Sequence, residues 1–186
     1  MDQRQISEWQ TLLTGAHDAL RAASPGCIVH CAVLPSFADG ESWEVIATPR
    51  SAPGRVTARH RQWSYEVDAA KVRTPVERLR HPAILAPTIH TREFELDPGE
   101  LNALMANLDA AWVTPRQPSS SLNLDGTAYD LTFGWGATES RFRWCGRVPA
   151  GWQPLQDFVG ALFEVLRTAG AQDDAEDGRR STEDVG

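Results

Sequence analysis

The chain has 186 residues, of which 41% are hydrophobic and 23% charged, and its formal net charge is −7. This length and composition are typical of one globular domain that can bury a core without disulfides or a structural metal. The apolar runs are too short to span a membrane, and the N-terminus lacks the apolar region of a secretory signal. We therefore expect a cytoplasmic protein that makes no membrane contact.

The charge is unevenly distributed along the chain. Residues 171–186 hold six acidic and two basic residues, whereas residues 50–81 hold eight basic and three acidic ones. Because the C-terminal segment is also poor in apolar residues, we expect a single domain over residues 1–170 followed by an acidic disordered tail over 171–186. The basic stretch is the most informative charge feature of the chain, and its charges are either functional or simply solvated.

The first third of the chain predicts one helix followed by two strands. Over residues 3–22, apolar residues recur at alternating three- and four-residue spacings, which indicates a helix. They are Ile6, Trp9, Leu13, Ala16 and Leu20. Residues 27–34 are apolar at both parities except for His30, as expected for a central strand covered on both faces. Residues 43–48 predict a second strand with alternating burial.

Residues 55–67 predict a third strand whose apolar face changes along its length. The apolar positions are even at Val56 and Ala58, but odd at Trp63, Tyr65 and Val67. A strict period of two does not allow this change. Either a β-bulge near residues 60–62 shifts the parity, or the other face of the strand becomes buried part-way along.

Two capping patterns predict helices in the middle of the chain. Thr74-Pro75-Val76-Glu77 predicts a short helix, and Asp97-Pro98-Gly99-Glu100 predicts a longer one. The longer helix carries apolar residues on one face: Leu101, Leu104, Met105, Leu108 and Trp112. Between the two helices, residues 88–96 predict a strand.

The C-terminal third predicts a three-stranded meander and a final helix. Asp125-Gly126 favours a tight hairpin turn between residues 122–124 and 127–133. A further strand follows over residues 139–145, and a helix over 154–170, where Gly170 ends it.

The order of these elements indicates the fold class. Strands and helices do not alternate in the rhythm of a parallel βαβ fold. We therefore predict an α+β fold with a single antiparallel or mixed sheet of about six to seven strands. N-terminal, central and C-terminal helices pack on this sheet.

Cysteine and histidine are zinc ligands, and Cys27, His30, Cys31 and Cys145 are therefore candidates for a metal site. In an extended strand, Cys27 and Cys31 lie about 13 Å apart, and His30 points to the opposite face. This separation disfavours a shared metal and excludes a disulfide between the two cysteines. We expect buried, reduced cysteines and no metal or other cofactor.

A small catalytic site is one alternative interpretation. Glu93 and Glu95 share a strand face about 7 Å apart, a spacing compatible with paired acid and base carboxylates. His60 and His90 could act as general bases beside them. The chain contains no nucleophile elbow, phosphate-binding glycine loop or dinucleotide fingerprint, so no residue is assigned a catalytic role.

Nucleic-acid binding is a second alternative. Arg59, Arg61 and the other basic residues of 50–81 could contact phosphates. Trp63 and Tyr65 could stack on nucleobases. Nucleic-acid-binding domains usually have a pI above about nine. The sequence pI of 5.2 disfavours this alternative.

Residues near the C-terminal meander are the better candidates for a protein contact. Arg141 and Arg143 point to the same face of their strand as Cys145, opposite the core positions of that strand. A cross-strand pair with Asp130 would explain both arginines structurally, and a binding patch is the alternative. Trp135 lies at a turn, where an aromatic residue is favoured as a contact for a partner.

Two segments carry a resemblance to known proteins. The pattern D-G-T-x-Y-D-L begins at Asp125, and R-W-x-G-x-x-P-x-x-W-x-x-L begins at Arg143. Together they resemble small bacterial proteins of unassigned function and, more loosely, immunity proteins. The latter resemblance implies a domain that binds and neutralises a cognate toxin.

We therefore predict a non-enzymatic domain that binds another protein, with an immunity-type inhibitor of a bacterial toxin as the specific form. The predicted contact residues are Trp135, Arg141, Arg143, Arg59 and Arg61. Such a protein needs no cofactor and acts by occluding its partner, with charge complementarity accelerating association. The small enzyme and the nucleic-acid-binding accessory protein stay as alternatives, and the oligomeric state stays open.

Overall fold

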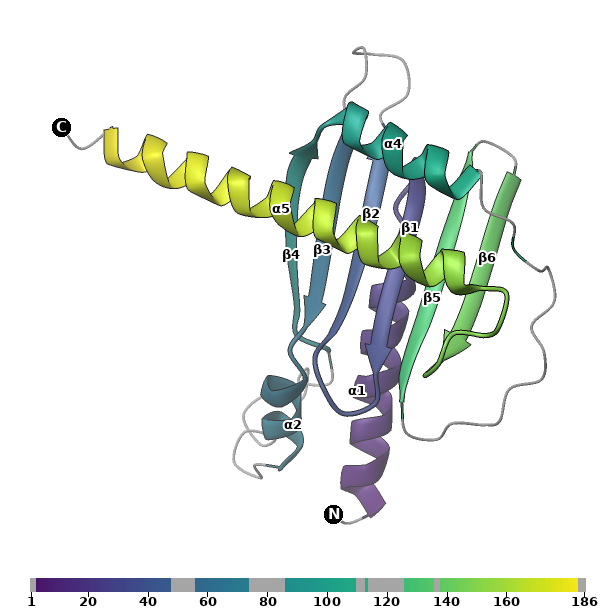
Figure 1. The fold of residues 1–186 in the computed structure, drawn as a ribbon. Coiled ribbons are helices and arrows are strands. Elements are labelled where there is room, and N and C mark those ends of the chain that lie inside the picture. Colours follow the sequence, from purple (N-terminus) through teal and green to yellow (C-terminus); the bar gives the residue numbers. More distant parts are fainter. Residues whose placement is uncertain are drawn as a thin grey trace.

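The chain folds around one six-stranded sheet in which every neighbouring pair is antiparallel, in the order β4-β3-β2-β1-β5-β6 (Figure 1). The computed structural model describes residues 3–47, 56–73, 86–109, 113, 126–135 and 138–183. The strands are β1 (Cys27–Pro35), β2 (Gly40–Ala47), β3 (Val56–Trp63), β4 (Ile89–Leu96), β5 (Thr127–Trp135) and β6 (Thr138–Cys145). The helices are α1 (Gln3–Arg21), α2 (Tyr65–Arg73), α4 (Pro98–Asp109) and α5 (Gln153–Glu183). The predicted α+β fold is confirmed.

Helices cover both faces of the sheet. α1 lies on one face, here called the α1 face, and α4 and α5 lie on the other, here called the α5 face (Figure 1). The larger apolar core lies between the sheet and α4 and α5, and a smaller core lies between the sheet and α1. Val29 and Cys31 of β1 enter the larger core, whereas Ala32 and Leu34 enter the smaller one. Burial on two faces therefore explains why β1 is apolar at both parities, as predicted.

The third strand ends earlier than the sequence predicts. β3 pairs with both β2 and β4 in a continuous register from Val56 to Trp63, so this strand has no bulge near residues 60–62. Val56 packs in the larger core, but Trp63 is buried in the smaller core beside α1. The second explanation of the parity change is thus confirmed. Tyr65 and Val67 belong to α2, and their assignment to the strand is wrong.

Side chains from distant segments hold α2 in place. The Asp39 carboxylate accepts a hydrogen bond from the Tyr65 backbone N–H at 2.8 Å, which caps the start of the helix. Within α2, the buried Asp68 carboxylate accepts bonds from Trp63 Nε1 and Lys71 Nζ, each at 2.7 Å, and from the Thr88 backbone N–H at 2.9 Å. The charge of Lys71 is therefore paired inside the fold.

The last helix is longer than predicted. α5 crosses the sheet, continues past Gly170 to Glu183 and projects beyond β4 (Figure 1). The predicted end at Gly170 is therefore wrong. One glycine costs a helix only about 1 kcal/mol, so it does not by itself end one. The boundary of the folded domain at residue 170 stays a prediction.

Several other predicted features lie outside the described residues: the short helix expected from Thr74, the strand expected over residues 122–124, and the burial of Trp112. In the ranges that the structure describes, no helix combines the length and apolarity needed to cross a membrane.

Candidate functional site

A row of polar residues crosses the α1 face from one edge of the sheet to the other. Its members are cross-strand neighbours on all six strands: Glu93, Arg59, Glu44, His30, Thr132 and Arg141, from β4 to β6. α1 ends at Arg21, and His30 of this row bonds the Leu20 carbonyl in the last turn of that helix, so the row lies beside the end of α1. The charged residues predicted for partner binding therefore lie on one face of the sheet.

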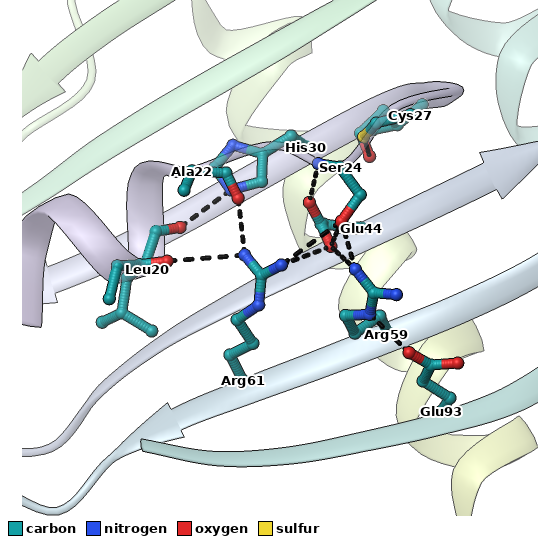
Figure 2. Close-up of polar contacts among 11 residues, drawn as sticks. Leu20, Ala22, Ser24, Cys27, His30, Glu44, Arg59, Arg61 and Glu93 are labelled. Carbon is teal, nitrogen blue, oxygen red and sulfur yellow. Dashed lines mark hydrogen bonds and ion pairs between the residues drawn. The ribbon is translucent and has the colours of Figure 1, made fainter. Parts of the chain in front are cut away.

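Glu44 is the centre of the row (Figure 2). Its side chain is fully buried, which is costly for a carboxylate unless charged donors surround it. The Ser24 backbone N–H and hydroxyl donate to it at 2.6 and 2.9 Å. Arg59 and Arg61 reach the same carboxylate at 3.2 and 3.1 Å. Glu44 thus gathers two arginines and the segment that follows α1 into one network.

The same network caps the C-terminus of α1. The last carbonyls of a helix lack partners within the helix. Arg61 donates to the Ala22 carbonyl at 2.5 Å, and His30 Nε2 donates to the Leu20 carbonyl at 2.8 Å (Figure 2). Burial lowers the pKa of His30, so this imidazole is neutral near pH 7 and carries its proton on Nε2. Arg59 also binds Glu93 at 2.6 Å.

These contacts change the interpretation of two predicted contact residues. The side chains of Arg59 and Arg61 are only 23% and 16% exposed, and both are held by Glu44. Their partners lie within the chain, so both arginines have a structural role. Arg59 is separated from Arg141 by three strands, β2, β1 and β5.

A second cluster forms where α1 ends beside β5 and β6. The Asp130 carboxylate is 2% exposed and binds Arg141 through two hydrogen bonds of 2.8 and 2.7 Å. Arg143 Nε reaches it at 2.8 Å and Arg21 Nε at 3.4 Å. Burial alone would raise the pKa of Asp130, but the bonds and charges of Arg141 and Arg143 outweigh burial and lower it. The predicted cross-strand pair with Asp130 is confirmed.

Two of these arginines also face solvent. The side chains of Arg141 and Arg143 are 42% and 57% exposed, although Asp130 fixes one side of each. Trp135 ends β5 opposite Thr138, close in the chain to this cluster. The side chain of Trp135 lies outside the described residues. We call Arg21, Arg141 and Arg143 the arginine patch.

The α5 face carries a separate polar group around Glu41 and His60. His60 Nε2 lies 3.1 Å from a Glu41 oxygen, and Trp43 Nε1 donates to the same oxygen at 3.0 Å. Trp43 and His60 stack with centroids 3.9 Å apart. Arg167 from α5 binds the other Glu41 oxygen at 3.1 Å. Burial would raise the pKa of Glu41, but these donors outweigh it and lower the pKa.

This arrangement corrects the expected His/Glu catalytic site. His60 pairs across strands with Arg92 on the α5 face, whereas Glu93 pairs with Arg59 on the α1 face. Because successive side chains of a strand point to opposite faces, Glu93 and Glu95 lie on the far side of the sheet from His60 and His90. The structure does not bring these four residues together.

The prediction that the cysteines are buried holds for Cys31 but is wrong for Cys145, which is exposed to solvent on the edge strand β6. Cys31 is buried in the larger core, Cys27 is partly buried and Cys145 is exposed, and none of the three forms a disulfide. Burial raises the pKa of the Cys27 thiol to about 12. Among the described residues, no group of three or more histidine, cysteine, aspartate or glutamate side chains is placed to hold a metal ion.

No protein-family model, curated protein or solved structure matches this chain.

Proposed function

We propose that this chain is a non-enzymatic protein-binding domain, and that the arginine patch is its contact surface. One observation carries the proposal: a single buried carboxylate, Asp130, accepts hydrogen bonds from Arg141 and Arg143 and lies 3.4 Å from Arg21, and the side chains of Arg141 and Arg143 remain about half exposed. A side chain that is already fixed loses less conformational entropy when it binds. Arginine is also enriched among the residues that dominate protein interfaces.

The charge of the patch indicates the chemistry of the partner. Three arginines surround one carboxylate, so the patch has an excess of positive charge on a chain whose formal net charge is −7. Guanidinium groups bind carboxylates in a planar, two-point geometry. The partner therefore presents an acidic surface, and attraction between the two surfaces accelerates association.

The internal pairing of the basic stretch argues against a nucleic-acid partner. Arg59 and Arg61 bind Glu44, and Lys71 binds Asp68. Three of the basic residues that could have contacted phosphates are therefore paired with carboxylates within the fold. A nucleic-acid surface needs a continuous array of uncompensated cations. The arginine patch is too small for that array but has the size of an interface hot spot.

A toxin is the specific partner that the sequence resemblance favours. An immunity-type inhibitor needs no cofactor and acts by covering the site of its target. An acidic surface beside that site would match the arginine patch. If the partner is a toxin, one equivalent of this chain stops its activity, and the Arg141→Ala, Arg143→Ala double variant does not.

Affinity capture from the host lysate tests the proposal. The tagged wild-type chain should retain a stoichiometric protein, and the Arg141→Ala, Arg143→Ala variant should lose it. Arg4→Ala is the matched control, because Arg4 is an exposed arginine on α1 that pairs with Glu8, one turn away, at 2.8 Å. Chemical cross-linking should place an acidic segment of the partner beside β6.

One result would contradict the proposed contact surface. Equal capture by the wild type and the double variant would show that the arginine patch is not the contact surface. Circular dichroism of the double variant must match that of the wild type, so that loss of capture is not loss of folding. If the double variant unfolds, Arg143→Gln replaces it, because this change leaves both bonds between Arg141 and Asp130 in place.

A further inference from the structure

We infer that the cavity beside Glu41 and His60 on the α5 face binds a small aromatic carboxylate. The cavity measures about 250 Å³ and lies between β2, β3, β4 and α5. It is on the opposite side of the sheet from the arginine patch, so this inference does not depend on the proposed function. Its walls combine aromatic rings with two arginines.

Aromatic and aliphatic side chains form the apolar part of the cavity. Trp43 lies flat against His60, with an angle of 14° between their rings, and it meets Phe94 edge-on at a centroid distance of 6.2 Å. Leu166 of α5 lines the same space. Aromatic rings prefer such stacked and edge-on neighbours. An aromatic ligand would meet the same kind of neighbours in this part of the cavity.

Two arginines from different elements supply positive charge. Arg92 of β4 and Arg167 of α5 both line the cavity, and their side chains are 37% and 57% exposed. Arg167 gives one nitrogen to Glu41 at 3.1 Å, and Arg92 lies 3.8 Å from Asp173. A guanidinium has five N–H donors, so Arg167 can bind Glu41 and a second carboxylate together.

Glu41 does not by itself exclude an anion. Its carboxylate is already bound by Trp43, His60 and Arg167, and these donors disperse its charge. Arg92 and Arg167 are matched by Glu41, which lines the cavity, and by Asp173, which lies 3.8 Å from Arg92, so the site carries no excess of negative charge that would repel an anion. The volume is below the range of about 300–1,000 Å³ that is typical for drug-sized ligands. One aromatic ring with a carboxylate suits this size and charge.

Gly170 lines one wall of the cavity, and its carbonyl accepts a hydrogen bond from Arg92. A Cβ atom at Gly170 would lie 3.4 and 3.5 Å from two atoms of the Phe94 ring and 3.8 Å from an Arg92 nitrogen. A larger side chain here would therefore occupy the space between these two residues. Gly160 lies on the same helix, and a Cβ atom there would meet no atom within 4 Å. The two glycines provide a matched pair for testing.

Benzoate is the probe, and the Trp43 indole N–H signal in the NMR spectrum is the reporter, identified by its loss in Trp43→Phe. We expect a saturable shift of this signal with benzoate. Benzamide, which has the same shape without the charge, and inorganic phosphate, which lacks the ring, should each bind roughly tenfold or more weakly. Gly170→Leu and Arg167→Gln should weaken benzoate binding by a similar factor, and Gly160→Leu should not.

Any of four results would overturn the inference. The first is the absence of a saturable shift with benzoate, and the second is equal binding of benzamide. The third is phosphate binding in preference to benzoate, which would assign the cavity to inorganic anions. Because Gly160→Leu carries the same helix change, equal loss of binding in both glycine variants would also contradict the cavity as the site.

Discussion

Glu44 is the residue on which the polar network of the α1 face depends. It is fully buried and holds Ser24, Arg59 and Arg61 at once. We expect Glu44→Gln to lower the free energy of unfolding by about 3 kcal/mol, since removal of one partner leaves buried charges without compensation. Urea denaturation measures this. Glu93→Gln is the control, because its carboxylate is half exposed and its loss should cost less than about 1 kcal/mol.

If Glu44→Gln lowered the free energy of unfolding by less than about 1 kcal/mol, solvent would be compensating the charges of Arg59 and Arg61. The network would then have no stabilising role.

Asp130 should make stability depend on pH in the acidic range. Its pKa in the folded chain is lower than the ordinary value of 3.8. A carboxyl whose folded pKa is depressed stabilises the fold above its unfolded pKa, and this contribution is lost as the pH falls from about 4 towards the folded pKa. We expect the wild type to lose more stability than Asp130→Asn when the pH falls from about 5 to about 3, because this range spans the unfolded pKa of the carboxyl. Thermal unfolding across this range measures the difference, and identical pH profiles would contradict it.

The three cysteines should differ in reactivity. Cys145 is exposed, whereas burial raises the pKa of Cys27 and of Cys31 and keeps both as thiols at neutral pH. We expect iodoacetamide to modify Cys145 alone in the folded chain, and all three cysteines after denaturation. Mass spectrometry of the peptides identifies the modified residues. Rapid modification of Cys31 without denaturant would show that the larger core opens.

The residue contacts that the sequence predicts are those within one tight hairpin. Arg141 and Arg143 could be paired with Asp130 because β5 and β6 are joined by a short turn that nearly fixes their register. The contacts of Glu44 with Arg59 and of Glu41 with His60 join β2 and β3, whose longer connection leaves the register open. These partners could not be chosen from the sequence.

At the scale of elements, the β5–β6 hairpin positions the arginine patch. Gly134 pairs with Glu139 near its turn, and a Cβ atom at Gly134 would overlap the Thr138 carbonyl oxygen and lie 3.0 Å from the Glu139 Cα. We expect Gly134→Ala to destabilise the fold by roughly 2 kcal/mol or more, because the backbone must shift. Gly160→Ala should instead stabilise α5 by about 0.4–1 kcal/mol.

Differential scanning calorimetry of the two alanine variants measures both changes. If Gly134→Ala were neutral, the close backbone approach at this hairpin would be wrong.

The periodicity of apolar residues predicts most helices and strands, and the wrong predictions concern where these elements begin or end. β1, β2, β4, β6 and α4 were expected near the positions where they lie. The boundary between β3 and α2 was missed because Trp63, Tyr65 and Val67 keep a period of two across it. Part of the signal that starts α2 is the side chain of Asp39, which is distant in the chain. Local sequence patterns cannot contain such a tertiary cap.

At the scale of the whole molecule, the sheet separates two chemically different surfaces. The α1 face ends at the arginine patch, and the α5 face contains the cavity with Glu41, His60 and two arginines. The strand order that creates this separation was not predictable, because the sequence does not indicate which strands lie side by side. The net charge of the chain follows directly from the sequence, but the partners of the ion pairs within the fold do not.

The proposed contact between the arginine patch and an acidic partner can be measured directly. The decisive measurement is the dissociation constant of the captured partner for the wild type, Arg143→Gln and Arg147→Gln, determined by calorimetry at two salt concentrations. Arg147 is also exposed and lies just beyond β6, which makes it a close control. We predict that Arg143→Gln weakens binding roughly tenfold or more and reduces its salt dependence, while Arg147→Gln leaves both unchanged. Equal dissociation constants for the three proteins would contradict the assignment of the arginine patch as the contact surface.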